Sequence, residues 1–293
     1  MPYVLLICST LFWSGNFVLS RGMHAEIPPI GLAFWRWLTA FLILAPFGLR
    51  LMYRQREQLK RHWRFILCQG LLGVTGFNTL IYLAVQTTSA INAVLVNSCI
   101  PVIIVVVCRL VYGERLSLRQ CVGVCISFGG VLLIISKGDI TLLLQLTFNR
   151  GDLLVLLAAF VWAFYSANFR KYPAGLNSIG YLTAIIITGL FFLFPLYLFE
   201  LSGGRTVVLN TPTVLTICYV ALFASVLAFI CWNKAVRQIG ASRAGPFIHL
   251  MVVFSTILAI TFLDETLYAH QFQGIVLVFT GIFLTTLAVK KQG

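Results

Sequence analysis

Long apolar runs divide the chain, and its charged residues lie almost entirely in the short breaks between those runs. A helix needs about 20 apolar residues to cross the hydrocarbon core of a bilayer. Inside that core each run has to be helical, because every backbone N–H and C=O group must find a partner within its own segment. Ten runs can be marked, approximately Tyr3–Ser20, Pro29–Arg50, Phe65–Val85, Ala90–Tyr112, Leu118–Ser136, Asp152–Arg170, Ser178–Phe199, Thr213–Lys234, Ala241–Leu263 and Gln271–Val289. We therefore predict an all-α integral membrane protein with ten transmembrane helices.

The composition argues against a water-soluble enzyme or nucleic-acid-binding domain. Of the 293 residues, 60% are hydrophobic and only 10% are charged, whereas a soluble domain is about a quarter charged. Ten membrane helices use roughly 200 residues, which leaves no room for a separate soluble domain. The net charge of +13 lies mostly in the connections, and its densest segment, 54–64, fits a loop beside anionic lipid headgroups. We expect membrane lipid as a partner and no nucleic acid.

The distribution of Lys and Arg predicts the orientation. If the amino terminus is cytoplasmic, the inner connections hold 16 Lys and Arg residues and the outer ones hold 4, with Arg36 inside a span. Cytoplasmic connections of membrane proteins carry the excess of positive charge. Both termini are therefore expected in the cytoplasm.

One stretch of the chain recurs 151 residues later. Gly113–Gly123 and Asp264–Gly274 share the pattern Glu-x-Leu-x-x-x-Gln-x-x-Gly, and Gly130 recurs as Gly281 at the same offset. Further upstream, weaker matches follow in the same order. Recurrence in a fixed order indicates an internal duplication, here with five predicted spans in each copy.

An odd number of spans inverts the second copy. We divide the chain into a first repeat over residues 1–137, a periplasmic connection over 138–150 and a second repeat over 151–293. Because five spans cross the membrane an odd number of times, the second repeat starts on the opposite side from the first. The copies are then related by a pseudo-two-fold axis in the membrane plane, as in transporters that expose a midplane site alternately to each side. We predict two inverted repeats around a central cavity.

The duplicated unit resembles that of a known family. Each copy contains a Pro-bearing helix, the Glu-x-Leu-x-x-x-Gln-x-x-Gly turn and a Gly-rich last helix, and the matching pieces of the first copy are Arg36, Tyr82–Ala90, Pro101, Gly113–Gly123 and Gly129–Leu133. In these motifs the chain is similar to the drug/metabolite transporter superfamily and, within it, to the ten-helix EamA family. The resemblance implies export of amino acids or other small metabolites across the bacterial inner membrane. The overall pattern is similar to that of the family's aromatic amino-acid exporters.

Polar and aromatic residues within the predicted spans are candidates for the cavity lining, because polar groups inside a membrane are costly. Trp13 and Asn16 share one helical face, and Trp162 and Tyr165 form the corresponding stripe in the sixth span. The candidates are Trp13, Asn16, Asn78, Tyr82, Asn97, Trp162, Tyr165 and His249. Core packing is the alternative for the tryptophans. For His249 the alternatives are a packing histidine, a pore group or a proton carrier.

Four residues are candidates for a gate or hinge: Arg36, Pro101, Pro195 and Pro246. Arg36 either extends outward to the membrane interface or serves as a cation at an outer gate or for a substrate carboxylate. Pro101 deprives the Asn97 carbonyl of its intrahelical donor, so a kink there can move a gate. Pro195 and Pro246 can act similarly.

The predicted spans contain no clear Asp or Glu. Drug–proton antiporters need a membrane-embedded carboxylate for which substrate and proton compete. We therefore predict facilitative transport, or coupling through His249 or through a charge on the substrate. The four histidines show no metal-ligand spacing and the eight cysteines form no Cys-x-x-Cys pair, so neither a metal nor another cofactor is expected.

Together these features predict a non-enzymatic exporter of small molecules that works by alternating access. Its aromatic and amide candidates favour flat, amphipathic substrates such as aromatic or large apolar amino acids. The alternatives within transport are a facilitator or an exporter of other metabolites or drugs, such as nucleosides, sugars or lipophilic compounds. A channel usually relies on oligomeric symmetry, and a membrane-embedded enzyme needs a nucleophile–base or metal set, so both are weaker hypotheses.

Overall fold

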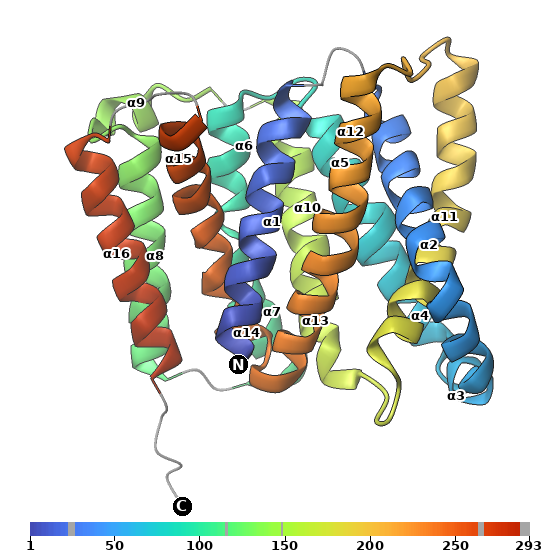
Figure 1. Cartoon of the computed structure of the whole chain (residues 1–293). Helices are drawn as coiled ribbons and strands as arrows, with labels where there is room; N and C mark the ends of the chain where they lie inside the picture. The colour runs from blue at the N-terminus through green and yellow to red at the C-terminus, as the bar shows by residue number, and fades with distance from the viewer. Residues whose placement is uncertain (23–26, 115–116, 148, 263–266, 288–293) are drawn as a thin grey trace, which may run out of the picture.

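The computed structural model describes residues 1–22, 27–114, 117–147, 149–262 and 267–287, which are helical throughout apart from their connections. The helices lie side by side in one bundle, and their connections gather at its two ends (Figure 1). The elements are α1 (Pro2–Gly22), α2 (Pro29–Arg54), α3 (Arg56–Arg61), α4 (Trp63–Gln69), η1 (Gly70–Gly76), α5 (Phe77–Ala84), α6 (Ala90–Asn97), α7 (Ile100–Tyr112), α8 (Leu118–Ile135), α9 (Ile140–Leu144), α10 (Arg150–Ala167), η2 (Asn168–Lys171), α11 (Ser178–Ser202), α12 (Thr211–Tyr219), η3 (Val220–Leu227), α13 (Ala228–Ile239), α14 (Ala241–Ala244), η4 (Gly245–His249), α15 (Leu250–Phe262) and α16 (Ala269–Thr286).

Nine helical stretches of the described chain are long and apolar enough to cross a membrane. They are Pro29–Arg54, Trp63–Ala84, Asn92–Tyr112, Leu118–Ile135, Arg150–Lys171, Ser178–Ser202, Thr211–Ile239, Ala241–Leu258 and Ala269–Thr286. Helix α1 adds a further 21 helical residues, which pack against α13 and α15. Large apolar side chains such as Leu110 and Phe199 are more than three-quarters exposed, as a surface in contact with lipid requires. The protein is an all-helical, multi-pass membrane protein.

The start of α1 and the end of α16 lie at the same end of the bundle. The Tyr3 hydroxyl, in the first turn of α1, donates a hydrogen bond of 3.4 Å to the carbonyl oxygen of Thr286, the last residue of α16. This end, called the terminal end below, is the lower one in Figure 1, and it also carries α3 and α14.

Helices α8 and α16 pack together closely and antiparallel. Gly123 faces the carbonyl oxygen of Gly281, and Gly130 faces that of Gly274, so the residue number rises along one helix as it falls along the other. A Cβ atom on any of these four glycines would lie less than 3.0 Å from the backbone opposite. Only glycine permits this approach of two backbones.

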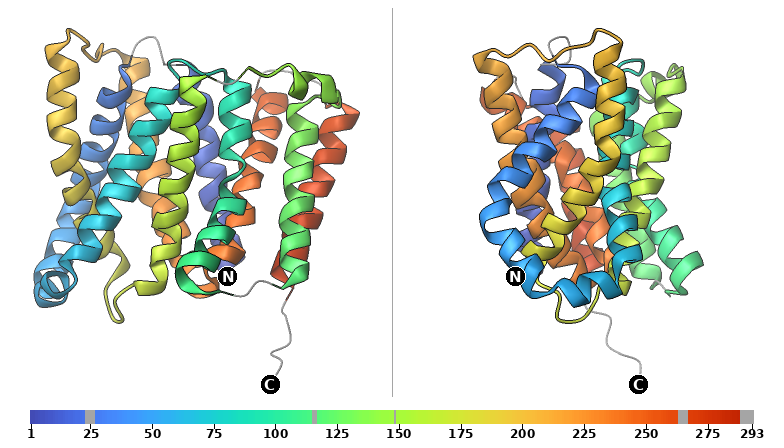
Figure 2. Two further views of the ribbon diagram at one scale, coloured as in Figure 1. Left: turned by 180° about the vertical axis from the view of Figure 1, so that it is seen from behind. Right: turned by 90° about the vertical axis from the view of Figure 1, so that its right-hand side faces the viewer.

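Helices α2 and α11 are antiparallel as well, because Gly31 lies against Glu200 and Gly180 lies against Leu51. Other contacts join residues that are 149 or 151 positions apart. The rings of Trp13 and Trp162 and the pair Ser98 and His249 are likewise in contact. Figure 2 shows from behind that α8 lies beside α16 at one side of the bundle and α2 beside α11 at the other.

Several of the long helical stretches are interrupted. Counting α1 as the first, the third and the eighth each contain a π-helical turn, η1 and η3, while the fourth breaks at Ser98 and Cys99 and the ninth contains the 3₁₀ turn η4 near its start. Pro101 in the first turn of α7 and Pro246 in η4 lack the N–H that would continue the helix. Pro195, by contrast, lies within α11 without ending it.

Two carboxylates lie buried in the end turns of membrane helices. Glu200, near the end of α11, accepts hydrogen bonds from the backbone N–H groups of Ile30 and Gly31 at 3.1 and 2.6 Å. It thereby caps the start of α2, where the helix dipole favours an anion.

Asp152 plays the corresponding part in the first turn of α10. Its carboxylate accepts hydrogen bonds from the Asn149 N–H at 2.7 Å, from the Asn92 side-chain amide at 3.0 Å and from the Thr88 hydroxyl. Asp152 thus accepts a hydrogen bond from the backbone at the start of α10, and it links α10 to Thr88 and to Asn92 in the first turn of α6. Both carboxylates serve the structure at the end of the bundle opposite the terminal end.

Candidate functional site

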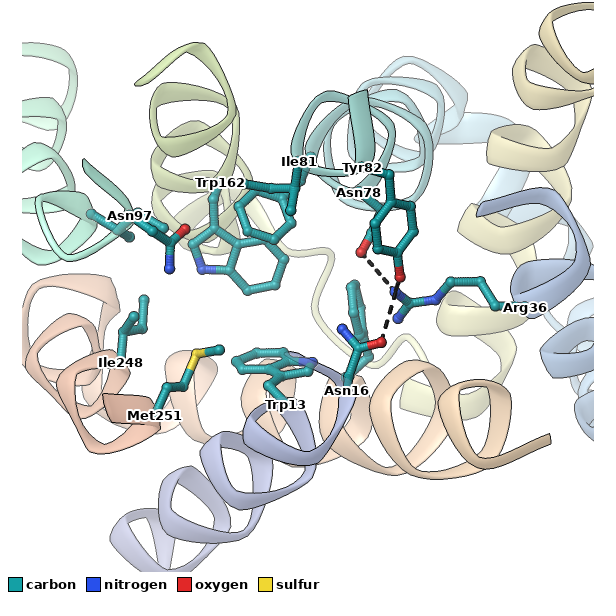
Figure 3. A pocket seen from close by; sticks show the side chains of 13 residues that line it. Trp13, Asn16, Arg36, Asn78, Ile81, Tyr82, Asn97, Trp162, Ile248 and Met251 are labelled. Carbon is teal, nitrogen blue, oxygen red and sulfur yellow. Dashed lines mark hydrogen bonds between the residues drawn. The ribbon is translucent and has the colours of Figure 1, made fainter. Parts of the chain in front are cut away.

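A small cavity lies midway along the helices, between elements from both halves of the chain (Figure 3). Thirteen residues line it: Trp13, Asn16, Arg36, Phe77, Asn78, Ile81, Tyr82, Asn97, Ile100, Trp162, Phe229, Ile248 and Met251. About 40 Å³ is open to the centre of a water-sized sphere, which is enough for a few water molecules. A site for a small organic molecule needs roughly 300 Å³ or more, so the cavity is too small for a substrate in this conformation.

Arg36 extends into this cavity and is 1% exposed. Its Nε donates to the Ser225 hydroxyl at 2.8 Å, and its Nη1 donates to the Asn78 side-chain oxygen at 3.0 Å and to the Tyr82 hydroxyl at 2.6 Å. The guanidinium carbon also lies 5.2 Å from the centre of the Trp37 ring. The alternative in which Arg36 extends outward to the membrane interface is therefore wrong.

Backbone carbonyls of the two π-helical turns hold two of the side chains that accept hydrogen bonds from Arg36. The Asn78 side-chain amide donates to the Gly73 carbonyl of η1 at 3.2 Å, and the Ser225 hydroxyl donates to the Val220 carbonyl of η3 at 3.0 Å. Each bond reaches back five residues, to carbonyls that a π turn displaces from regular helical pairing. The turns therefore orient the two side chains that hold the guanidinium, in keeping with the frequent place of π turns at functional sites.

No carboxylate of the described chain lies within 4.0 Å of the Arg36 guanidinium. Its Nη2 group also makes no hydrogen bond to any described residue. Arginine keeps its charge under physiological conditions, and a buried charge without a counter-ion costs several kcal/mol. The cavity is consequently positive, with hydrogen-bond donors left over.

Aromatic rings form the opposite side of the cavity. Trp13 meets Trp162 edge to face, with 5.2 Å between ring centres, and its indole N–H donates to the Ala224 carbonyl at 3.0 Å. Phe77 lies 4.8 Å from Trp162, and Phe229 lies 5.6 Å from it. These rings occupy space between the two halves of the chain.

Asn97 lies at the far side of the tryptophans from Arg36, at the end of α6 (Figure 3). Its side-chain oxygen is buried and has no hydrogen-bond partner in the described part of the chain. Asn97 also borders a second small cavity of about 60 Å³, which His249 lines as well. An unsatisfied acceptor of this kind costs about 1–3 kcal/mol.

Of the predicted cavity residues, Tyr165 and His249 do not line the central cavity in this conformation. The Tyr165 ring packs behind Trp162 at 5.1 Å, and its hydroxyl donates to Asn233 at 2.9 Å. His249 is completely buried, with Nε2 2.9 Å from the Ser98 carbonyl oxygen and Nδ1 2.8 Å from the Ser127 hydroxyl. Nε2 must donate to the carbonyl, so in the neutral ring Nδ1 is an acceptor for the Ser127 hydroxyl, whose one proton also has the Val124 carbonyl oxygen within 3.0 Å.

The predicted hinge prolines lie in different places. Pro101 packs against Gly245, whose added Cβ would lie 3.4 Å from it, so the breaks of the fourth and ninth membrane helices meet beside the cavity. Pro246 follows directly in η4. Pro195 lies on the outer face of α11, in a shallow apolar hollow that it shares with Phe34, and does not border the cavity.

A larger hollow opens at the terminal end, with a volume of about 390 Å³. Arg170 and Arg237 line it, and the Arg237 guanidinium lies 3.8 Å from the centre of the Tyr172 ring. Burial raises the pKa of Tyr172 to about 12, although the charge of Arg237 opposes that shift. We call this hollow the vestibule.

A polar clasp and an aromatic layer close the path from the vestibule to the cavity. Glu114 lies 3.5 Å from Arg170 and accepts a hydrogen bond of 2.8 Å from Ser242, so it ties the ends of α7 and η2 to α14. Deeper in, the Trp232 indole donates to Ser166 of the vestibule at 3.3 Å, and its ring lies 5.4 Å from that of Trp13. The cavity is thus separated from this end by packed rings.

Sequence reasoning missed several residues of the site. Ser225 holds Arg36, and Phe77, Phe229 and Met251 line the cavity. An isolated hydroxyl in the apolar stretch that contains Ser225 was a usable signal, whereas the apolar residues are indistinguishable from core. Within the described residues no group of three His, Cys, Asp or Glu side chains could hold a metal ion.

Comparison with known proteins places these features in context. Residues 1–136 and 149–287 match the EamA-like transporter family. The chain is 24% identical to the uncharacterized transporter YyaM of Bacillus subtilis, covering 98% of this chain and 94% of that one. It is 29% identical to an uncharacterized transporter of Archaeoglobus fulgidus, with 97% and 96% covered.

A third relative carries a more specific name. The chain is 25% identical to a probable amino-acid metabolite efflux pump of Escherichia coli, covering 98% of this chain and 95% of that one. A crystal structure with 18% sequence identity superposes with a TM-score of 0.81 over 98% of this chain and 96% of the other, which supports the fold.

Proposed function

The chain belongs to the EamA-like transporter family, and from that premise we propose that it exports a small molecule across the bacterial inner membrane by alternating access. The expected substrates are aromatic or large apolar amino acids or related metabolites. The resemblance deduced from the sequence is thereby confirmed at the level of the family. The name of the E. coli relative, a probable amino-acid metabolite efflux pump, supports this range of substrates.

The central cavity is the observation that carries the proposal. It combines one buried cation, Arg36, with amides and aromatic rings, and it is closed from the vestibule by the layer around Trp232. A site enclosed at mid-membrane and lined by both halves of the chain fits an occluded state of a carrier. A channel would instead offer a continuous path.

The antiparallel contacts support two inverted five-helix repeats. In both α8 with α16 and α2 with α11, two contacts across an antiparallel crossing are related by a shift of 151 or 149 positions: Gly123–Gly281 with Gly274–Gly130, and Gly31–Glu200 with Gly180–Leu51. A two-fold axis in the membrane plane has this effect on the helices that it relates, because it reverses their direction. The paired π turns, η1 and η3, recur at the same spacing. On this proposal α1 is the tenth membrane helix.

Orientation is proposed from charge. The terminal end carries α3, with Arg56, Lys60 and Arg61, and the vestibule arginines (Figure 1). The buried acids Asp152 and Glu200 lie at the other end. By the positive-inside rule the terminal end is cytoplasmic, and both termini lie there.

Movement between the two open states requires hinges, and the breaks at Pro101 and Pro246 are the proposed ones. They meet next to the cavity, and the backbone there is already released from regular helical pairing. Pro195, whose helix is unbroken, is proposed as a weaker hinge that lets α11 bend.

A facilitative mode is favoured over proton antiport. None of the described residues that line the cavity is Asp or Glu, and the two buried acids are engaged as helix caps. His249 is satisfied by Ser98 and Ser127, so in this conformation it serves packing.

Reconstitution tests the proposed function. The full chain, purified and inserted into liposomes, is expected to give saturable flux of compounds that first raise its melting temperature in a screen of amino acids, nucleosides and sugars. Trp13→Ala and Trp162→Ala are each expected to raise the concentration that gives half-maximal flux about fivefold, because stacking on each ring contributes on the order of 1 kcal/mol. Phe199→Ala, which truncates an aromatic side chain 77% exposed on the outer surface, is the matched control. Flux that rises linearly with concentration, or half-saturation that is unchanged in both tryptophan variants, would contradict the proposal.

A further inference from the structure

We infer that the substrate is a flat organic anion, an aromatic ring system bearing one carboxylate, and that Arg36 binds that carboxylate. This rests on the proposed function and narrows it. Deaminated aromatic acids would fit the cavity better than the corresponding amino acids, and amines would fit least.

The charge of the cavity is the first step. Among the described lining residues Arg36 is the one ionised group, and no Asp or Glu accompanies it. A monocarboxylate would neutralise the cavity, whereas a zwitterion would leave it with a net positive charge. An ammonium group near the guanidinium would also be repelled, with no described anion at hand to offset the repulsion.

The unused donors of Arg36 are the second step. Nε and Nη1 are occupied by Ser225, Asn78 and Tyr82, and this fixes the plane of the guanidinium. Nη2 is the remaining nitrogen, and the hydrogen bonds of Arg36 to the described residues all come from Nε and Nη1. A carboxylate offers two oxygens and charge-assisted bonds, which are about twice as strong as neutral ones.

The far side of the cavity is the third step. Figure 3 shows Trp13 and Trp162 between Arg36 and Asn97, with the Asn97 amide directed toward the cavity. A ligand ring that separates the Trp13 and Trp162 rings, which are in contact in this conformation, and that holds its acid on Arg36 would direct its distal edge toward the unpartnered Asn97 oxygen. Indole N–H or phenol O–H groups at that edge would satisfy the oxygen. The flexible Met251 side chain, which also lines the cavity, can move aside to admit the ligand.

The inference also accounts for the lack of a coupling acid. A cell interior is electrically negative, so a monoanion leaves it downhill without a proton. Transport of the anion alone moves one negative charge per cycle, and an imposed membrane potential would therefore drive it.

The test compares ligands that share one indole ring. Indole-3-acetate, indole-3-acetamide, tryptophan and tryptamine are offered to the full chain in liposomes, with half-saturation of uptake and melting temperature as readouts. The acetate is expected to bind at least about tenfold more tightly than its uncharged amide, since one charge-assisted pair contributes that much or more. Tryptophan is expected between them, and tryptamine is expected to be excluded.

Variants of Arg36 test whether this residue causes the preference for the carboxylate. Arg36→Gln is expected to remove the preference for the acetate over the amide, and Arg36→Lys to keep part of it. Arg205→Gln, which removes one exposed positive charge outside the cavity, is expected to change nothing. If Arg36→Gln fails to fold, the ligand series on the unmodified protein and the Arg36→Lys variant still decide the question.

The dependence of uptake on membrane potential is the last test. With valinomycin and tenfold more potassium outside than inside, indole-3-acetate is expected to accumulate about tenfold, as a monoanion must at equilibrium. Equal uptake of acetate and amide, a preference for tryptophan, or no accumulation would overturn the inference while leaving a transporter. If no compound from this series or from the wider screen is transported, the proposed function fails with it.

Discussion

Gly130→Ala gives the sharpest test of the crossing between α8 and α16, because Gly129 beside it provides a matched control. A Cβ on Gly130 would lie 2.6 Å from the Gly274 carbonyl oxygen and 2.9 Å from the Val278 nitrogen, whereas one on Gly129 would meet nothing within 4 Å. Ordinary van der Waals contact begins at about 3.4 Å. The two backbones would therefore have to separate by about 0.8 Å.

Overpacking of this kind costs about 1–3 kcal/mol. Gly129→Ala should instead be neutral or stabilising by up to about 1 kcal/mol, because alanine is the better helix former in the same helix. Both variants are measured by thermal unfolding in detergent, followed through the fraction of protein that remains monodisperse. Equal melting temperatures for the two variants would refute the contact and the antiparallel pairing built on it.

Two further predictions concern acids outside the cavity. Glu200→Gln is expected to destabilise the fold by about 1–2 kcal/mol, because it weakens the cap on the start of α2. Glu57→Gln, at an exposed site, is the control and should leave the melting temperature unchanged. Equal decreases in melting temperature for the two variants would refute the cap. Glu114→Gln removes the ion pair with Arg170 and is expected to loosen the terminal end, so a cysteine placed at Ser166 in a cysteine-free background should react faster with a maleimide. An unchanged labelling rate would show that Glu114 does not hold this end closed.

The positions of the membrane helices were predictable from hydropathy alone. The predicted run Ser178–Phe199 corresponds to α11, Ser178–Ser202, and the run Leu118–Ser136 to α8, Leu118–Ile135. A continuous apolar segment has to be helical in a membrane, and the predicted and observed helix ends therefore agree to within a few residues. The π turns were not predictable, because no residue pattern distinguishes them from regular helix.

The directions in which polar side chains point were harder to predict from the sequence than the positions of the helices. Arg36 stands between two tryptophans in the sequence, which is compatible with either the interface or the interior. The packing of α2 against η3 brings the Ser225 hydroxyl to 2.8 Å from Arg36 Nε, and this contact places the Arg36 side chain in the interior. Asp152 stands at the start of a predicted run, but the sequence gives no sign that Asn92 and Thr88 will bind its carboxylate.

Six of the eight predicted cavity residues line the cavity, together with the predicted gate residue Arg36. Their spacing along single helices identified them, since residues on one face of a helix share one environment. Tyr165 and His249 lie one layer behind, where a partner hidden from the sequence, Asn233 or Ser98, satisfies each of them.

Exchange across the membrane tests the central claim most directly. Liposomes that contain the protein are loaded with unlabelled indole-3-acetate, and uptake of the labelled compound is compared with that of empty ones. A carrier that alternates around one closed site returns faster when loaded, so internal substrate should stimulate uptake several-fold, and Trp13→Ala should abolish the stimulation. Uptake that is saturable yet insensitive to internal substrate, or that never saturates, would contradict alternating access through this cavity.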